Sequence, residues 1–132
     1  MDDRELIDRA RTALEDAYVP YSGYSVGAAL ETAAGEVYTG CNIENANYSN
    51  SLHAEEVAIG TATSDGHRAF ERVAVSSGER DGVLPCGMCR QTLAEFCDEE
   101  FLVLCDVGDG IERYRLGRLL PDAIGAEDLE DV

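Results

Sequence analysis

A histidine and a pair of cysteines have the residue types and spacing of metal ligands. His53 lies in the stretch S-L-H-A-E-E at positions 51–56, and Cys86 and Cys89 lie in P-C-G-M-C-R-Q at positions 85–91. Thiolate and imidazole are ligands that zinc takes in proteins, and a catalytic zinc site combines three protein ligands with an open position for water. The three residues are therefore a candidate catalytic zinc site.

Glu55, two positions after the histidine, is the candidate acid–base group. Zinc lowers the pKa of a bound water from about 15.7 to about 7, and a carboxylate beside that water can take its proton and deliver it elsewhere. H-x-E followed by P-C-x-x-C is an established signature of zinc enzymes that deaminate cytosine or adenine. The pattern therefore predicts hydrolytic deamination with Glu55 as the catalytic residue.

Each signal taken alone also has a structural interpretation. A single histidine or a C-x-x-C pair is more often structural than catalytic, and such pairs also occur in zinc ribbons and redox sites. A zinc-stabilised binding protein without catalysis would need His53, Cys86 and Cys89 but would have no use for Glu55. The ligands alone are compatible with either class of protein.

The elements that must position these residues alternate between helical and strand patterns. Apolar spacing predicts helices and strands, with Pro20 preventing the first helix from continuing. The expected helices cover 3–17, 53–63 and 86–97, and the expected strands cover 25–30, 36–43, 72–77, 101–107 and, more weakly, 111–116. This interleaving indicates an α/β layer fold in one domain over 1–132. Both halves of the candidate site fall at helix starts, where the helix dipole favours thiolate over thiol.

The charge balance restricts the class of partner. The chain has 27 acidic residues against 10 basic ones, all of them arginine, for a formal net charge of -17. Nucleic-acid affinity comes largely from neutralising phosphates with Lys and Arg, so we expect no nucleic-acid partner. Strong acidity without lysine fits a halophilic protein in a very salty cytoplasm, where screening weakens self-repulsion.

The location follows from what the chain lacks. No stretch approaches the roughly 20 apolar residues of a membrane span, and the first residues, M-D-D-R-E-L-I-D, do not resemble a signal peptide. An odd count of five cysteines argues against a disulfide framework. We therefore expect a cytoplasmic protein with no membrane contact.

Several motifs beyond the candidate ligands carry a family resemblance. Y-V-P-Y-S-G-Y-S-V-G-A-A-L at 18–30, G-C-N-I-E-N-A-N-Y-S at 40–49 and L-L-P-D-A at 119–123 accompany the two zinc motifs. Over nearly its whole length the chain resembles the small homotetrameric cytidine deaminases. The resemblance implies a three-layer α-β-α sandwich with a mixed, mostly covered five-stranded sheet, a bound Zn²⁺ and a homotetramer. It implies a small nucleoside as substrate, cytidine or 2′-deoxycytidine, in pyrimidine salvage. A sibling alternative is deamination of another small cytosine compound such as blasticidin S.

The resemblance also assigns substrate contacts. It implies that Asn42 and Glu44 hold the ribose hydroxyls, for which an amide and a carboxylate offer suitable donors and acceptors. It places the backbone of Ala54 at the pyrimidine edge, Tyr24 against the nucleoside, and Tyr48 near a neighbouring subunit's site. An alternative for Asn42 and Glu44 is a solvated loop that caps itself.

Three positions depart from the family pattern. Many tetrameric members have Cys-Ala-Glu-Arg where this chain has His53 through Glu56, and Ile124 stands where they often have phenylalanine. Zinc with three thiolates carries a formal charge of -1 that an arginine can offset, whereas two thiolates and a neutral histidine leave zinc formally neutral. The arginine is then dispensable, but charge does not explain why a glutamate replaces it.

Overall fold

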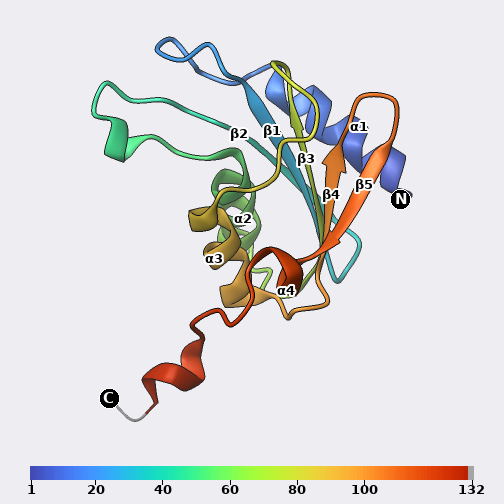
Figure 1. Ribbon diagram of the computed structural model, residues 1–132, viewed down its shortest axis with the longest axis vertical. Helices are drawn as coiled ribbons and strands as arrows, with labels where there is room; N and C mark the ends of the chain where they lie inside the picture. Colours follow the sequence, from blue (N-terminus) through green and yellow to red (C-terminus); the bar gives the residue numbers. More distant parts are fainter. Residues whose placement is uncertain (131–132) are drawn as a thin grey trace.

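The computed structural model describes residues 1–130, so the last two residues of the domain expected over 1–132 lie outside it. Its centre is a five-stranded sheet with the strand order β2-β1-β3-β4-β5. Strands β3 and β4 are parallel, and the other neighbouring pairs are antiparallel (Figure 1). The strands are β1 (Val26–Thr32), β2 (Val37–Cys41), β3 (Phe70–Ser77), β4 (Leu102–Asp106) and β5 (Ile111–Arg115). The expected mixed sheet of five strands is confirmed.

Helices cover both faces of this sheet. Helix α1 (Asp3–Leu14) lies on one face, and α2 (Ala54–Ser64) and α3 (Gly87–Phe96) lie on the other (Figure 1). The short elements are η1 (Tyr48–Asn50), α4 (Leu116–Leu119) and η2 (Ala126–Leu129). The three-layer arrangement is thus confirmed. None of the helices in residues 1–130 has the length and apolar run needed to cross a membrane.

The first helix is shorter than expected. The prediction of a helix over 3–17 is wrong at its end, because α1 stops at Leu14 and the chain continues through tight turns. The backbone N–H of Tyr18 then donates to the carbonyl of Asn42 at 3.0 Å, and the N–H of Glu44 donates to the carbonyl of Tyr18 at 2.8 Å. This pairing with the segment after β2 draws the chain away from the helix axis well before Pro20.

Alternation along the central strands builds a separate core on each face. Successive strand residues point to opposite faces of a sheet, so Ala28 and Leu30 of β1 join one cluster while Ala29 joins the other. The cluster under α1 contains Leu6, Ile7, Ala10, Ala29, Ala74 and Leu104. The cluster under α2 and α3 includes Ala54, Ala58, Ile59, Val73, Leu93 and Val103. The sheet is therefore the common support for two different helical layers.

Two glycines allow the helices to approach the sheet closely. A Cβ at Gly40 of β2 would lie 2.4 Å from the carbonyl oxygen of Ala54, in the first turn of α2. A Cβ at Gly27 of β1 would lie 2.1 Å from the carbonyl oxygen of Ala10 in α1. Any larger residue at these positions would push the helix away. The contact at Gly40 fixes the depth at which the start of α2 meets the sheet.

Candidate active site

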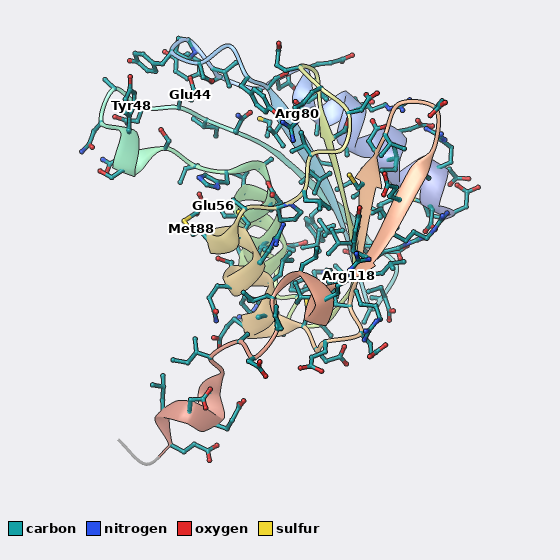
Figure 2. The ribbon with its side chains drawn as sticks, viewed as in Figure 1. Glu44, Tyr48, Glu56, Arg80, Met88 and Arg118 are labelled. Carbon is teal, nitrogen blue, oxygen red and sulfur yellow. The ribbon has the colours of Figure 1, made fainter. Side chains whose placement is uncertain are left out.

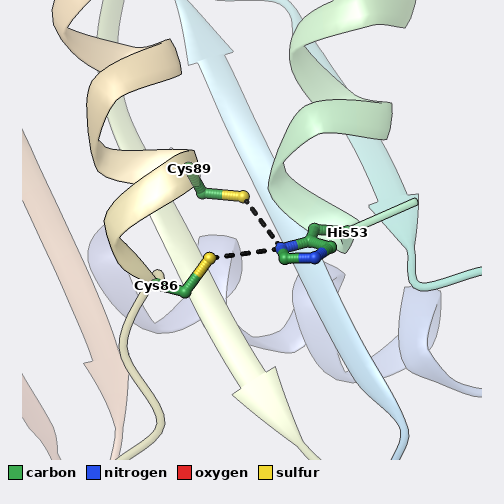
Figure 3. A group of neighbouring side chains, drawn as sticks. All are labelled: His53, Cys86 and Cys89. Carbon is green, nitrogen blue, oxygen red and sulfur yellow. Dashed lines mark hydrogen bonds between the residues drawn. The ribbon is translucent and has the colours of Figure 1, made fainter. Parts of the chain in front are cut away.

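The three expected metal ligands lie together where two helix starts face each other. His53 is the N-cap of α2, Cys86 is the N-cap of α3, and Cys89 lies in the first turn of α3. Nδ1 of His53 lies 3.2 Å from Sγ of Cys86 and 3.5 Å from Sγ of Cys89 (Figure 3). Tetrahedral zinc with its usual bond lengths separates a nitrogen and a sulfur ligand by about 3.6 Å. The three side chains are therefore spaced to share one zinc ion.

The chemistry of the two thiols also fits a bound cation. Cys89 is fully buried and Cys86 is exposed. Burial, followed by the nearby carboxylate of Glu55, raises the pKa of the Cys89 thiol well above its usual range. A coordinating cation reverses this tendency and holds such a thiol as thiolate. The donor set of two sulfurs and one imidazole nitrogen is one that zinc takes in catalytic sites.

Glu55 lies in the first turn of α2 and is only 5% exposed. Burial raises the pKa of its carboxyl group, while its own backbone N–H and His53 act in the opposite direction. A buried carboxyl group beside the ligands can hold a proton that an exposed one would release. The side chain thus has the surroundings required of an acid–base group.

Glu56 stabilises the start of α2 with a hydrogen bond to the backbone. Its Oε1 accepts a hydrogen bond from the backbone N–H of His53 at 2.6 Å (Figure 2 labels Glu56). A carboxylate three positions after the N-cap can reach back to the N-cap N–H in this way. The glutamate that charge counting left unexplained therefore has a structural role. The signal was present in the sequence as an acidic residue at the third helical position.

Arg90 holds the start of α3, and sequence reasoning missed it. Its Nε donates to the carbonyl of Pro85 at 2.7 Å, and its Nη1 donates to the carbonyl of Leu119 at 2.9 Å. The first bond fixes the residue before Cys86, and the second ties this loop to the end of α4. An arginine directly after the second cysteine was the only available signal, because its distant partner is a backbone group.

A pocket of about 340 Å³ opens beside His53. It is lined by Tyr21, Ser22, Asn42, Glu44, Tyr48, Ser51, Leu52 and His53. Small-molecule sites are concave, with volumes of about 300–1,000 Å³ and a few convergent polar groups. Three of the residues expected to contact substrate, Asn42, Glu44 and Tyr48, therefore lie on the same pocket wall as a candidate ligand.

Asn42 and Glu44 also brace the loop before β1. Nδ2 of Asn42 donates to the carbonyl of Tyr24 at 2.7 Å, and its Oδ1 accepts from the N–H of Val26 at 2.9 Å. Oε1 of Glu44 accepts from the backbone N–H groups of Tyr21 and Ser22, at 3.0 and 3.1 Å. These bonds hold the pocket wall in place. They also agree with the alternative in which this loop caps itself.

The other residues singled out in the sequence differ in their burial and in whether they line this pocket. Ala54 is buried at the first position of α2, and Tyr24 is half-buried; neither is among the described residues that line the pocket. Tyr48 is 76% exposed, and its ring meets that of Tyr21 edge-on at 6.3 Å between centroids. Ile124 is exposed and lines a separate cavity beside α3 and α4.

The chain is similar to known proteins in both sequence and overall fold. The family model of the cytidine and deoxycytidylate deaminase zinc-binding region matches residues 1–105. The cytidine deaminase of Sporosarcina psychrophila is 46% identical over 130 residues, covering 98% of this chain and 96% of that protein. The crystal structure of cytidine deaminase from Burkholderia pseudomallei is 39% identical with a TM-score of 0.89, covering 94% of this chain and 100% of that one. The Mycobacterium tuberculosis structure is 40% identical with a TM-score of 0.85, covering 95% and 98% of the two chains.

Proposed function

The chain belongs to the cytidine deaminase family of zinc hydrolases, and from this premise we propose that it converts cytidine and 2′-deoxycytidine to uridine, 2′-deoxyuridine and ammonia. The observation that carries the proposal is the cluster of His53, Cys86 and Cys89 next to the buried Glu55, with His53 lining a pocket of about 340 Å³. Such a reaction serves pyrimidine salvage.

The proposed ligands for zinc are Nδ1 of His53 and the two cysteine sulfurs. When bound, the ion supplies a Lewis acid that makes a water molecule acidic enough to react near neutral pH. Cys86 and His53 both stand at helix N-termini, where the positive end of each helix dipole favours the anionic thiolate and an adjacent negative charge. Burial of Cys89 keeps one side of this ligand set away from solvent.

Glu55 is the proposed catalytic residue. It takes one proton from the attacking water and gives it to N3 of the base while the water oxygen bonds to C4. It then carries the second proton from this oxygen to the amine, so that the C4–N bond breaks, ammonia leaves and the C4 carbonyl forms. Positioned acid–base groups of this kind contribute about 10²–10⁴-fold to rates.

Pocket residues, together with Ala54 and Tyr24 beside the pocket lining, are proposed to bind the nucleoside. Glu44 and Asn42 line the pocket, and we propose that their carboxylate and amide groups bond to the sugar hydroxyls in addition to the loop contacts that they already make. The backbone of Ala54 binds the pyrimidine edge next to His53. Tyr24 packs against the nucleoside from the segment that Asn42 braces.

Assembly is the third part of the proposal. Several large apolar side chains are exposed at and beside the pocket. Tyr21, Tyr48 and Leu52 line it, and Tyr18 and Ile43 lie on the segments that pair next to Leu52. Contiguous exposed apolar residues are typical of surfaces that bind another protein. We propose that they pack in a homotetramer in which Tyr48 approaches a neighbouring subunit's site. Sedimentation velocity should then give four times the mass of a 14.3 kDa chain.

The remaining proposals concern the compartment, the partners and the salt concentration in which the protein works. A formal charge of -17 argues against a nucleic-acid partner, and we propose a cytoplasmic location from the absence of a membrane-span or signal-peptide pattern in the sequence. The net charge also favours a halophilic protein, because salt screens repulsion between like charges. The melting temperature should accordingly rise between low and molar KCl, and a flat response would contradict the halophilic assignment. We propose a single domain over 1–132, whose metal-free form should unfold in one transition.

The deciding experiment is Glu55→Gln. Glutamine keeps the size of the side chain but cannot carry the proton, so the variant should bind zinc like the parent and lose at least about 10²-fold in turnover of cytidine. Turnover is followed by the fall in absorbance of cytidine, and metal content by elemental analysis. The parent protein treated with a chelator provides the metal-free control. Parent-level turnover in a zinc-loaded variant would show that Glu55 is not the acid–base group.

A further inference from the structure

The start of α2 uses its N-cap residue for something other than capping. An N-cap side chain normally accepts a hydrogen bond from a free N–H in the first turn. Helix α1 follows this rule, since Oδ1 of Asp2 accepts from the N–H of Glu5 at 2.8 Å. The side chain of His53 makes no such bond, and its Nδ1 instead faces the two cysteine sulfurs. The helix that presents this ligand therefore begins without an ordinary cap.

Glu56 compensates from inside the helix. Its carboxylate accepts from the N–H of His53 at 2.6 Å, which links the third helical residue to the N-cap backbone. His53 is extended there, with φ of -92° and ψ of 150°. The close approach of β2 at Gly40 limits movement of the first turn of α2 towards the sheet. Glu56 restrains the N-cap peptide as well, through its bond to the N–H of His53.

We propose that Glu56 is a positioning residue for the metal centre. By accepting from the N–H of His53, Glu56 fixes the direction of the His53 Cα–Cβ bond. This orients Nδ1 of His53 towards the cysteine sulfurs before zinc binds. A prepositioned ligand loses less freedom on binding, so zinc binds more tightly. This inference rests on the proposed role of His53 as a ligand.

A cap that only stabilises the helix would behave differently. Loss of such a cap lowers the stability of the fold but leaves the metal affinity of the folded protein unchanged. Loss of a positioning bond lowers metal affinity in the folded protein, because the ligand must be reoriented. Replacement of groups that orient metal ligands typically costs about 10- to 100-fold in affinity.

The test compares Glu56→Ala, Glu56→Gln and Asp2→Ala in the full chain. Glutamine keeps an oxygen that can accept from His53, whereas alanine removes it. Asp2→Ala removes a cap of similar kind at α1, far along the chain from the ligands. Zinc affinity is measured by competition with a coloured chelator, and folding by thermal unfolding of the metal-free proteins.

We expect Glu56→Ala to weaken zinc binding by about tenfold or more, with Glu56→Gln close to the parent. Asp2→Ala should lower the melting temperature and leave zinc affinity unchanged. Parent-like zinc affinity in folded Glu56→Ala would overturn the inference. So would equal loss of affinity in Glu56→Gln and Glu56→Ala, since the acceptor would then be irrelevant.

A fourth variant separates this inference from the function on which it rests. His53→Ala should lose tight zinc binding altogether. If it instead binds zinc like the parent, the proposed ligand set is wrong and so is the positioning role. If His53→Ala loses zinc while Glu56→Ala keeps it, only the positioning role is wrong.

Discussion

The helices on the two faces of the sheet use their N-cap residues in different ways. On one face α1 is capped by Asp2, and its Arg11 forms a two-pronged ion pair with Asp106 of β4, at 2.7 Å for each bond. On the other face, the N-caps of α2 and α3 are His53 and Cys86, and neither side chain caps its helix. The polar groups of the first face bond to one another, whereas those of the second remain available to a metal ion.

This difference shows how a helix start can be converted into a metal site. An N-cap side chain already lies at the helix end, where free N–H groups and the helix dipole favour negative charge. When the cap is a metal ligand, another side chain must hold the backbone. Glu56 does so for α2 with a bond to His53, and Arg90 does so for α3 with a bond to Pro85. On the proposed metal-binding face, both helix starts are held by residues just after the candidate ligands.

The largest expected effect is on the metal-binding face. Cys89→Ser should abolish tight zinc binding and reduce cytidine turnover to the level of the chelated protein, because a hydroxyl group is a poor zinc ligand compared with a thiolate. The matched control is Cys105→Ser, which makes the same change at another buried thiol, on β4. Metal content after dialysis distinguishes the two. Equal zinc loss in both variants would mean that the effect comes from burying a hydroxyl group.

A smaller effect is expected at the ion pair under α1. Arg11, followed by the hydroxyl of Ser76, lowers the pKa of Asp106 to about 2 from its usual value of 3.8, although burial acts in the opposite direction. The ionised form therefore contributes stability above pH 3.8, and this contribution disappears as pH falls towards 2. Asp106→Asn should lose about 1–2 kcal/mol at pH 7, because solvent around half-exposed Arg11 weakens the pair.

The measurement for this pair is denaturant unfolding of parent and variant between pH 7 and pH 2. The difference between the two unfolding free energies should shrink towards the acid end, while zinc content at pH 7 stays equal. A difference that is constant with pH would show that the loss comes from packing and not from the charge of Asp106. Loss of zinc in Asp106→Asn would show that the ion pair under α1 also affects the metal-binding face.

The smallest expected effect is at the cap of α1. Asp2→Ala should cost about 1 kcal/mol, because one N–H in the first turn loses its partner. Asp2 is exposed and makes its capping bond only to Glu5, so turnover of cytidine should match the parent. Thermal unfolding and the cytidine assay check the two statements. A change in turnover larger than the change in folded fraction would contradict the structural assignment of this face.

Short-range patterns in the sequence were enough to find most of the fold and the candidate ligands. Apolar periodicity located the three main helices and five strands within a few residues, since it records which side of each element is buried. The exception was the end of α1, where pairing of Tyr18 with the segment after β2 overrides the helical pattern of residues 15–17. No local signal reports such a long-range bond.

The candidate site, like the fold, could be predicted from the sequence only in part. The residue types and spacing of His53, Glu55, Cys86 and Cys89 were sufficient to predict zinc and deamination, because coordination chemistry restricts which side chains serve. The role of Glu56 was readable in principle from its position at the third residue of a helix. The contact of Arg90 with Leu119 was not, because its acceptor is a backbone carbonyl with no side-chain signature.

The sequence alone determined the chemistry of the ligands and the alternation of helices and strands, because both depend on residue type and local order. Only the tertiary structure decided that α2 and α3 begin at the same place on one face of the sheet. Strand order decides this, since β2 and β3 both pair with β1 and both end beside Gly27. The loops that lead from β2 into α2 and from β3 into α3 therefore leave the same end of the sheet. Distances of 3.2 and 3.5 Å between residues more than thirty positions apart follow from that packing.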